Sequence, residues 1–233
     1  MVRLRERDGM KKGHWFWRGG LYCAGLLALT CGITLNTKTL LGVSPILSIP
    51  NCLSVLWGRD LGTLVTLLYL TFVLLQLPLK GRRFGLLDLL QFPVSILSGW
   101  LVGLYDANLN ILHPSSVLRV GLLALATLLT GAGICLTVNM DLAPNPADGL
   151  VGSLSQATGR SLGLCKNLFD LACVGIAVAL GLLLGGQVVG IGVGTVVSML
   201  LTGRVVAGIN RLFRNPMRRL AGLEPARKKP LTQ

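Results

Sequence analysis

Charged residues are scarce in this chain: of its 233 residues, 13% are Asp, Glu, Lys or Arg, whereas 52% are hydrophobic. A soluble domain carries about 25% charged residues, and this chain has too little polar surface to cover a water-soluble globule. The scarcity excludes a cytosolic enzyme, a disordered chain and a small secreted scaffold. It predicts an all-α integral membrane protein, in agreement with a mean hydropathy of +0.68.

Acidic residues are the rarer of the two charged classes. Nine Asp and Glu oppose 22 Lys and Arg, so the formal net charge is +13. The excess is concentrated in two basic tails, residues 1–18 and 210–233, which flank the apolar part of the chain. Such tails are typical of the cytoplasmic face of a membrane, where they meet anionic lipids. They lack the interleaved aromatic residues of a single-strand binder, so we expect the lipid bilayer as a partner and no nucleic acid.

Motifs for catalysis and cofactor binding are missing as well. None of the six cysteines forms a Cys-x-x-Cys pair, and no residues have metal-ligand or Ser/His/Asp spacing. The glycine-rich residues 190–195 contain no GxGxxG motif, so they are predicted to pack helices rather than to hold a nucleotide. We therefore expect no enzyme activity, no cofactor and no metal.

Long uncharged runs predict six membrane-spanning helices, each near the ~20 residues that cross ~30 Å of hydrocarbon. Residues 171–203 are uncharged throughout, which is too long for one crossing, and Gly185 and Gly186 mark the expected break. Six crossings put both termini on one side together with the loops of Lys80 and Arg160, so the excess of Lys and Arg predicts cytoplasmic termini. The expected spans are residues 19–37, 61–79, 89–105, 120–140, 162–184 and 188–209.

An internal repeat relates the two halves of the chain. After a shift of 101 residues, positions 32–67 match positions 133–168 at 12 of 36 sites, where composition alone gives about four. Each copy holds three spans, an odd number, so the second copy (residues 118–209) is expected to be inverted relative to the first (residues 19–106). The residues that mark the repeat include Pro45, Arg59, Gly62, Arg160 and Gly163.

After its first span, each copy carries an interrupted apolar segment, residues 40–57 and 142–158. Both segments are too short to cross a membrane, and in both an early proline precedes about three turns of predicted helix. We predict two re-entrant half-helices that enter from opposite faces and meet near the midplane. The alternative is an ordinary interfacial loop packed on the bundle, and the sequence leaves that alternative open.

Motifs in both copies resemble those of the YczE/YitT-like bacterial membrane proteins, over about residues 20–212. Two positions depart from the family: Lys166 stands where Arg is usual, and Gly203-Arg204 stands where Gly-Pro is usual. The resemblance implies a multi-span protein of the bacterial inner membrane without a settled activity, for which transport is the common assumption. It rests on residues 41–45, 58–62, 146–150 and 185–195 and on the pair Lys166 and Asp170.

Charges that fall at membrane depth form the candidate site. Lys166 and Asp170 are four residues apart and share one helix face. We expect them either to form a solute or proton site, with Asp170 as gate or proton acceptor, or to lock the fifth span to its neighbours as an ion pair. Asp148 lies at the start of the second half-helix, where it either caps that helix or binds a cationic group or a proton. The remaining members of the predicted substrate-binding set are Pro146, Ser44 and Asn51.

The pattern as a whole predicts a transporter or channel for a small polar or anionic solute. Inverted repeats are typical of such proteins, and half-helix N-termini that face a cavity favour anions. The alternative is a non-transporting accessory protein that stabilises another membrane system, with Lys166 and Asp170 as a structural pair. The solute, the coupling ion and the oligomeric state do not follow from the sequence.

Overall fold

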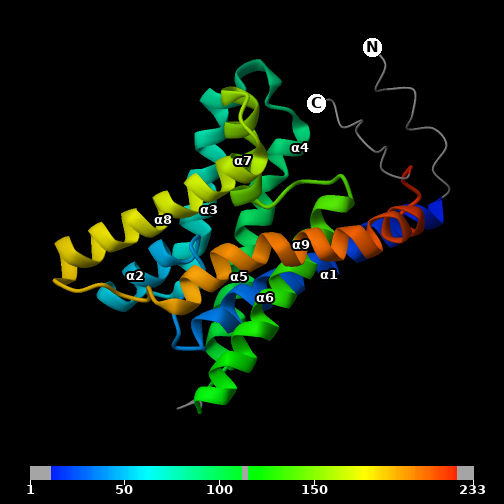
Figure 1. The fold of residues 1–233 in the computed structure, drawn as a ribbon. Coiled ribbons are helices and arrows are strands. Elements are labelled where there is room, and N and C mark those ends of the chain that lie inside the picture. Colours follow the sequence, from blue (N-terminus) through cyan, green and yellow to red (C-terminus); the bar gives the residue numbers. More distant parts are fainter. Residues whose placement is uncertain (1–11, 112–114, 225–233) are drawn as a thin grey trace.

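The computed structural model describes residues 12–111 and 115–224, and this part of the chain contains helices and loops but no strand. Ten helical elements follow one another along it (Figure 1). They are α1 (Lys12–Thr37), α2 (Ser48–Trp57), α3 (Leu61–Lys80), the 3-10 turn η1 (Gly81–Arg83), α4 (Leu86–Leu89), α5 (Gln91–Asn108), α6 (Ser116–Asn139), α7 (Pro146–Thr158), α8 (Leu162–Gly185) and α9 (Val193–Leu220).

Six helical stretches are long and apolar enough to cross a membrane, namely α1, α3, α4 with α5, α6, α8 and α9. Their number confirms the six spans predicted from the uncharged runs. The largest differences are at two ends, since α1 begins at Lys12 and α9 continues to Leu220, beyond the predicted ends at residues 19 and 209. Helix α9 also begins at Val193 instead of residue 188, and α6 begins at Ser116 instead of residue 120. Hydropathy set those predicted ends, whereas Lys and Arg are good helix formers that let a helix continue past its apolar stretch.

Helices α1 and α6 pack closely against each other through glycines. A Cβ atom at Gly32 of α1 would lie 2.6 Å from the backbone nitrogen of Thr130, and a Cβ atom at Gly133 of α6 would overlap the backbone nitrogen of Leu29. A shift of 101 residues turns the first contact into the second. The two helices therefore meet through equivalent positions, and each contact needs a residue without a side chain.

The short helices α2 and α7 end alike. Each is followed by a glycine in the left-handed conformation, Gly58 (φ 62°) and Gly159 (φ 68°). In each, the serine four residues before that glycine donates a hydrogen bond to the carbonyl of the arginine after it, at 2.6 Å and 2.7 Å. Glycine adopts this conformation at little cost, so the repeated Gly-Arg motif encodes the same turn twice.

Each short helix packs on the third helix of the other half. Helix α2 lies against α8, and α7 lies against α3. At the start of α2, the Ser48 hydroxyl donates to the carbonyl of Cys173, near the middle of α8, at 3.2 Å. Just before α7, Asn145 meets the hydroxyl of Tyr69, near the middle of α3. Both short helices thus begin at mid-length of a long helix.

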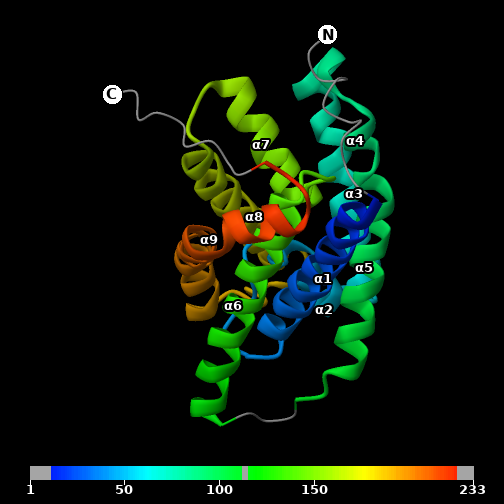
Figure 2. The ribbon, with the colours of Figure 1, turned by 90° about the vertical axis from the view of Figure 1, so that its right-hand side faces the viewer.

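Ion pairs and hydrogen bonds gather the ends of the long helices into two groups. Arg18 of α1 donates to the carbonyl of Asp141 at 2.7 Å, and Arg218 of α9 pairs with the carboxylate of the same residue at 2.9 Å. At another place Lys38 pairs with Asp106 at 2.7 Å. The start of α1 therefore lies beside the ends of α6 and α9 (Figure 1 and Figure 2), whereas the end of α1 lies beside the end of α5.

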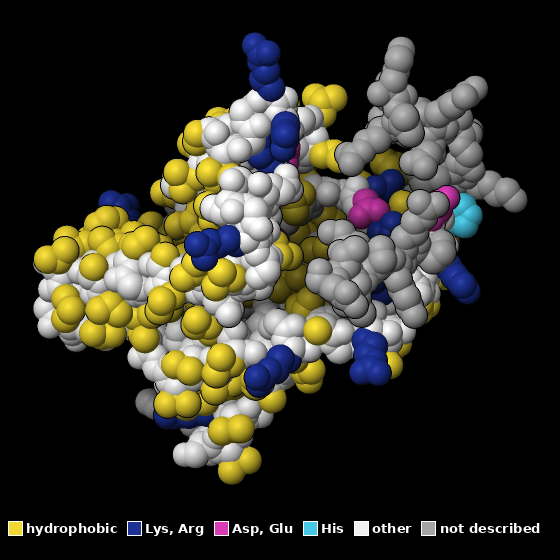
Figure 3. All heavy atoms as spheres, turned by 45° about the horizontal axis from the view of Figure 1, so that its top comes forward, with side chains coloured by type: hydrophobic (Ala, Val, Ile, Leu, Met, Phe, Trp, Pro, Cys, Tyr) yellow, Lys and Arg dark blue, Asp and Glu magenta, His cyan; other side chains and the backbone are white. Residues whose placement is uncertain are grey.

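Hydrophobic side chains cover much of the outer surface, including the part of Figure 3 where α8 extends away from the other helices. On α8, Leu171 is 60% exposed and Leu183 is 82% exposed. A soluble protein rarely exposes so much contiguous apolar surface. This surface is suited to contact with lipid tails.

Candidate functional site

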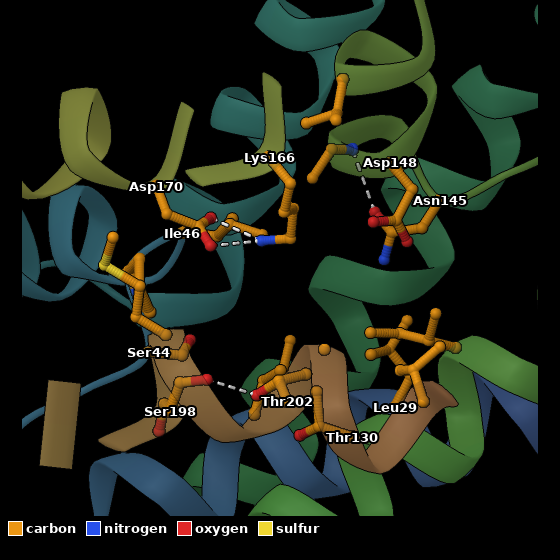
Figure 4. Close-up of a pocket in the computed structure, with 18 of the residues that line it drawn as sticks. Leu29, Ser44, Ile46, Thr130, Asn145, Asp148, Lys166, Asp170, Ser198 and Thr202 are labelled. Carbon is orange, nitrogen blue, oxygen red and sulfur yellow. Dashed lines mark hydrogen bonds and ion pairs between the residues drawn. The ribbon is translucent and has the colours of Figure 1, made fainter. Parts of the chain in front are cut away.

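A cavity of about 530 Å³ lies among the helices, lined by α1, the segment before α2, α3, α6, α7, α8 and α9. Of the predicted substrate-binding set, Ser44, Asp148, Lys166 and Asp170 line it. Figure 4 shows Lys166 and Asp170 on one side, Asp148 and Asn145 on another, and residues of α9 facing them. The fold therefore brings these predicted residues together from three separate segments.

Lys166 and Asp170 form an ion pair along one face of α8. The Lys166 Nζ atom donates to both carboxylate oxygens of Asp170, at 2.5 Å and 2.6 Å. The Asp170 side chain is 3% exposed and that of Lys166 is 31% exposed. The carboxylate is thus buried and satisfied by one ammonium group, which is how intramembrane charges are stabilised.

Asp148 lies in the first turn of α7, but it does not cap the helix. The cap is Asn145, whose side-chain oxygen accepts a hydrogen bond from the backbone nitrogen of Ala147 at 3.1 Å. Among the described residues, the Asp148 carboxylate accepts no hydrogen bond and forms no ion pair within 4.0 Å. Of the two roles predicted for Asp148, capping is therefore filled by its neighbour, while its half-buried carboxylate lines the cavity.

Ser44 and Asn145 precede the two short helices at equivalent positions of the repeat. Both line the cavity, as do Asp170 and Tyr69, which are also 101 residues apart. The Ser44 Oγ atom is buried and has no hydrogen-bond partner among the described residues. The segment before α2 therefore presents a free hydroxyl group where the segment before α7 presents a capping amide.

Pro146 and Asn51 belonged to the predicted set but do not line the cavity. Pro146 is buried at the start of α7, and its carbonyl accepts a hydrogen bond from Gln76 at 3.4 Å. Asn51 lies on the far face of α2 and packs against Gly190, where a Cβ atom would overlap its amide nitrogen. Both residues contact neighbouring segments instead, since a helix turns successive side chains to different faces.

Of the residues that mark the internal repeat, some line the cavity and others do not. Arg59 and Arg160 are exposed at the ends of the short helices, whereas Pro45 and Gly163 line the cavity. Gly62, the partner of Gly163 in the repeat, instead faces the backbone of α5. The two halves thus differ most around this pair of glycines.

The difference in packing around Gly62 and Gly163 creates the cavity. Helices α3 and α5 pack tightly, since a Cβ atom at Gly62 would lie 2.7 Å from the backbone nitrogen of Gly103. The corresponding helices α8 and α9 do not pack on each other to a similar extent within the described part of the chain. A Cβ atom at Gly163 or at Gly203, which face the cavity from these two helices, would meet nothing within 4 Å. The cavity therefore occupies the space that close helix packing fills in the first half.

A buried pair of glutamines, which the sequence did not predict, joins α3 and α5. Gln76 of α3 and Gln91 of α5 are fully buried and exchange two hydrogen bonds, at 2.9 Å and 3.1 Å. Gln91 also donates to Asp88, which pairs with Lys80. Gly149 of α7 rests on the two amides, with no room for a Cβ atom. The signal for this network was the two glutamines within apolar spans, where polar groups usually serve as interhelical contacts.

A row of polar side chains on α9, likewise not predicted from the sequence, faces the cavity. Ser198, Thr202 and Asn210 line the cavity at intervals of one or two turns. Ser198 accepts a hydrogen bond from Asn36 at 2.7 Å, and Asn210 accepts one from Asn139 at 2.7 Å. The spacing by four and eight residues was visible in the sequence, but it did not reveal which face of the helix met the cavity.

Within residues 12–111 and 115–224, no three His, Cys, Asp or Glu side chains gather as metal ligands. A model of a family of unknown function, DUF6198, matches residues 16–211. That match covers both halves of the repeat and all cavity residues, and its description does not name the YczE/YitT-like proteins that the motifs resemble. No curated protein and no solved structure matches the chain.

Proposed function

The chain belongs to DUF6198, a family of unknown function, and from that premise we propose that it is a transporter or channel whose solute site is the cavity of about 530 Å³. One observation carries the proposal: equivalent segments of both halves converge on this cavity, and its charged side chains are Asp148, Lys166 and Asp170. Transporters place their sites where repeats meet and where short helices begin.

The proposal includes two inverted repeats of three spans. The reciprocal contacts of Gly32 and Gly133 support it, since a two-fold relation exchanges equivalent positions of α1 and α6. The exchange of partners supports it too, because α2 packs on α8 while α7 packs on α3. The matched turns after the two short helices add a local likeness that apolar composition does not produce.

The proposal also makes α2 and α7 re-entrant half-helices. Their first residues touch the middle of α8 and of α3, which supports a start near the midplane. Their last residues, near Arg59 and Arg160, are exposed. An irregular backbone at membrane depth is stable where it lines a cavity, as the segments before α2 and α7 do.

The cell location belongs to the same proposal. We place the chain in the bacterial inner membrane with both termini in the cytoplasm, because Lys and Arg gather at the start of α1 and the end of α9. The contact of Arg18 and Arg218 with Asp141 brings these two basic ends to one side.

The access of water-soluble reagents to the cavity tests the proposed function. Thr202 lines the cavity, so Thr202→Cys, in a chain with the exposed Cys23 and part-exposed Cys31 replaced by Ser, should react with an impermeant charged maleimide. A solute pathway predicts labelling from each face of the membrane in separate experiments.

The matched control is Ser95→Cys, which is fully buried in α5 outside the cavity and should react from neither face. Labelling of Thr202→Cys from one face only, or from neither, contradicts the transport proposal.

One observation favours the non-transporting accessory role, namely that Asp170 is fully satisfied by Lys166. In that role the double variant Lys166→Met/Asp170→Leu keeps full function, because an apolar pair of similar size often replaces a buried ion pair without loss. Co-purification of a partner in fixed stoichiometry together with one-sided access to Thr202→Cys is the result that this role predicts.

A further inference from the structure

The numbers of acidic and basic side chains in the cavity lining indicate which charge a bound solute should carry. Its lining holds two acidic side chains and one basic one, Asp148, Asp170 and Lys166, so the formal charge is −1 when all three are charged. Lys166 already binds both oxygens of Asp170. The excess negative charge therefore resides on Asp148.

The surroundings of Asp148 leave its carboxylate available. Asn145 makes the cap bond of α7, and within the described residues no hydrogen bond or ion pair reaches the Asp148 carboxylate. A charged group at membrane depth is unstable unless it is paired. Lys166 acts on Asp148 only through space and is bonded to Asp170, so the cavity lacks a positive group in direct contact with Asp148.

The walls of the cavity are suited to the apolar part of an organic ligand. Apolar side chains from several helices line it, among them Leu29, Ile134, Val151 and Met199. A metal ion requires several ligands in its first shell, and within residues 12–111 and 115–224 no three His, Cys, Asp or Glu side chains gather to supply them. Quaternary ammonium ions are bound by several aromatic rings, whereas Tyr69 is the aromatic residue of this lining.

We propose that the cavity binds a primary ammonium ion with an apolar organic substituent, and that Asp148 is its counter-ion. The inference rests on the proposed function, and it replaces the small polar or anionic solute expected from the sequence with a cationic one. The polar groups around the cavity fit such a head group, because the free hydroxyl of Ser44 and the Asp148 carboxylate are both acceptors for N–H donors.

Thermal unfolding of the purified full chain tests the inference with three probes of equal chain length: n-hexylamine, n-hexanol and hexanoate, at pH 7. A ligand of the folded state raises the melting temperature. We expect a saturable rise with n-hexylamine, and little change with the alcohol or the acid. Asp148→Asn should weaken n-hexylamine binding by about 30-fold or more, since the buried charge pair is lost.

Two further variants keep the test specific. Asp148→Glu preserves the charge and should retain binding, and Asp106→Asn removes a carboxylate outside the cavity, where it pairs with Lys38, and should bind like the original chain. Asp148→Ser replaces Asp148→Asn if that variant does not fold.

Equal binding of n-hexylamine to the original chain and to Asp148→Asn overturns the inference, as does the failure of all three probes. Binding of hexanoate that depends on Lys166 overturns it as well but leaves the transport proposal intact. The transport proposal fails separately, through one-sided access to Thr202→Cys, so the two failures are distinguishable.

Discussion

Glycine decides the packing at the centre of the molecule. Gly32 and Gly133 let the backbones of α1 and α6 approach until no Cβ atom fits between them. Leucine or valine at either place would force the helices apart, which is why small residues mark close contacts between membrane helices.

Gly32→Ala and Gly133→Ala should each destabilise the protein by about 1–3 kcal/mol, the cost of overpacking a close contact. Thermal unfolding of the purified chain measures the loss. Gly121→Ala in α6, where a Cβ atom meets nothing within 4 Å, is the matched control and should unfold at the original temperature or slightly above it. Equal melting temperatures for all three variants would contradict the close contact.

Asp148 and Asn145 show why single positions are hard to assign from sequence. Both residue types are good N-caps, and they lie three positions apart at the start of α7. The backbone geometry gives the cap bond to Asn145, which frees Asp148 for the cavity. A pattern of residue types predicts that a helix start is capped, whereas the fold decides which side chain does so.

At the scale of elements, the short helices α2 and α7 are the segments on which the proposed inverted topology can be tested. Each helix is buried near its start and exposed near its end. A cysteine near the end of either helix is therefore accessible to a thiol reagent, whereas one near the start is not. Cys52 of α2 and Ser153 of α7 are buried and cannot serve as reporters. Val55 and Gln156, which are 101 residues apart, are exposed.

Val55→Cys should react with an impermeant thiol reagent added outside, and Gln156→Cys should react only with reagent that reaches the cytoplasmic side. The reason is that re-entrant helices of inverted copies end on opposite faces. Mass spectrometry of intact cells and inverted vesicles after labelling measures both sites, in a background without the exposed Cys23. Reaction of both sites from the same side would refute the inverted arrangement.

At the scale of the whole molecule, the two halves contain equivalent helices but differ in how closely their last two long helices pack against each other. The first half is closed by the packing of α3 on α5, whereas α8 and α9 leave the cavity between them in the described structure. The space for the proposed solute site arises from this difference, because close packing of α8 on α9 would fill it. The exposed apolar side chains of α8 show that this helix has little protein around it.

Orientation is a property of the whole chain and has its own test. Green fluorescent protein fused to the C-terminus should fluoresce, and alkaline phosphatase inserted between Gly186 and Gln187 should be active, because fluorescence requires the cytoplasm and phosphatase activity the outside. The charge distribution gives this expectation, since Lys and Arg collect on the cytoplasmic side. A dark C-terminal fusion with normal expression would contradict it.

The sequence by itself determined the class of protein, the six apolar helices and the repeat. It also predicted a substrate-binding set, of which four members line the cavity: Ser44, Asp148, Lys166 and Asp170. These features depend on composition and on spacing along one helix, which are local properties. The tertiary structure alone decided that Asn51 and Pro146 face elsewhere, that Gln76 and Gln91 pair, and that α9 lines the cavity. Such contacts join residues from distant parts of the chain, and the face that each helix turns inward is fixed only when its neighbours are in place.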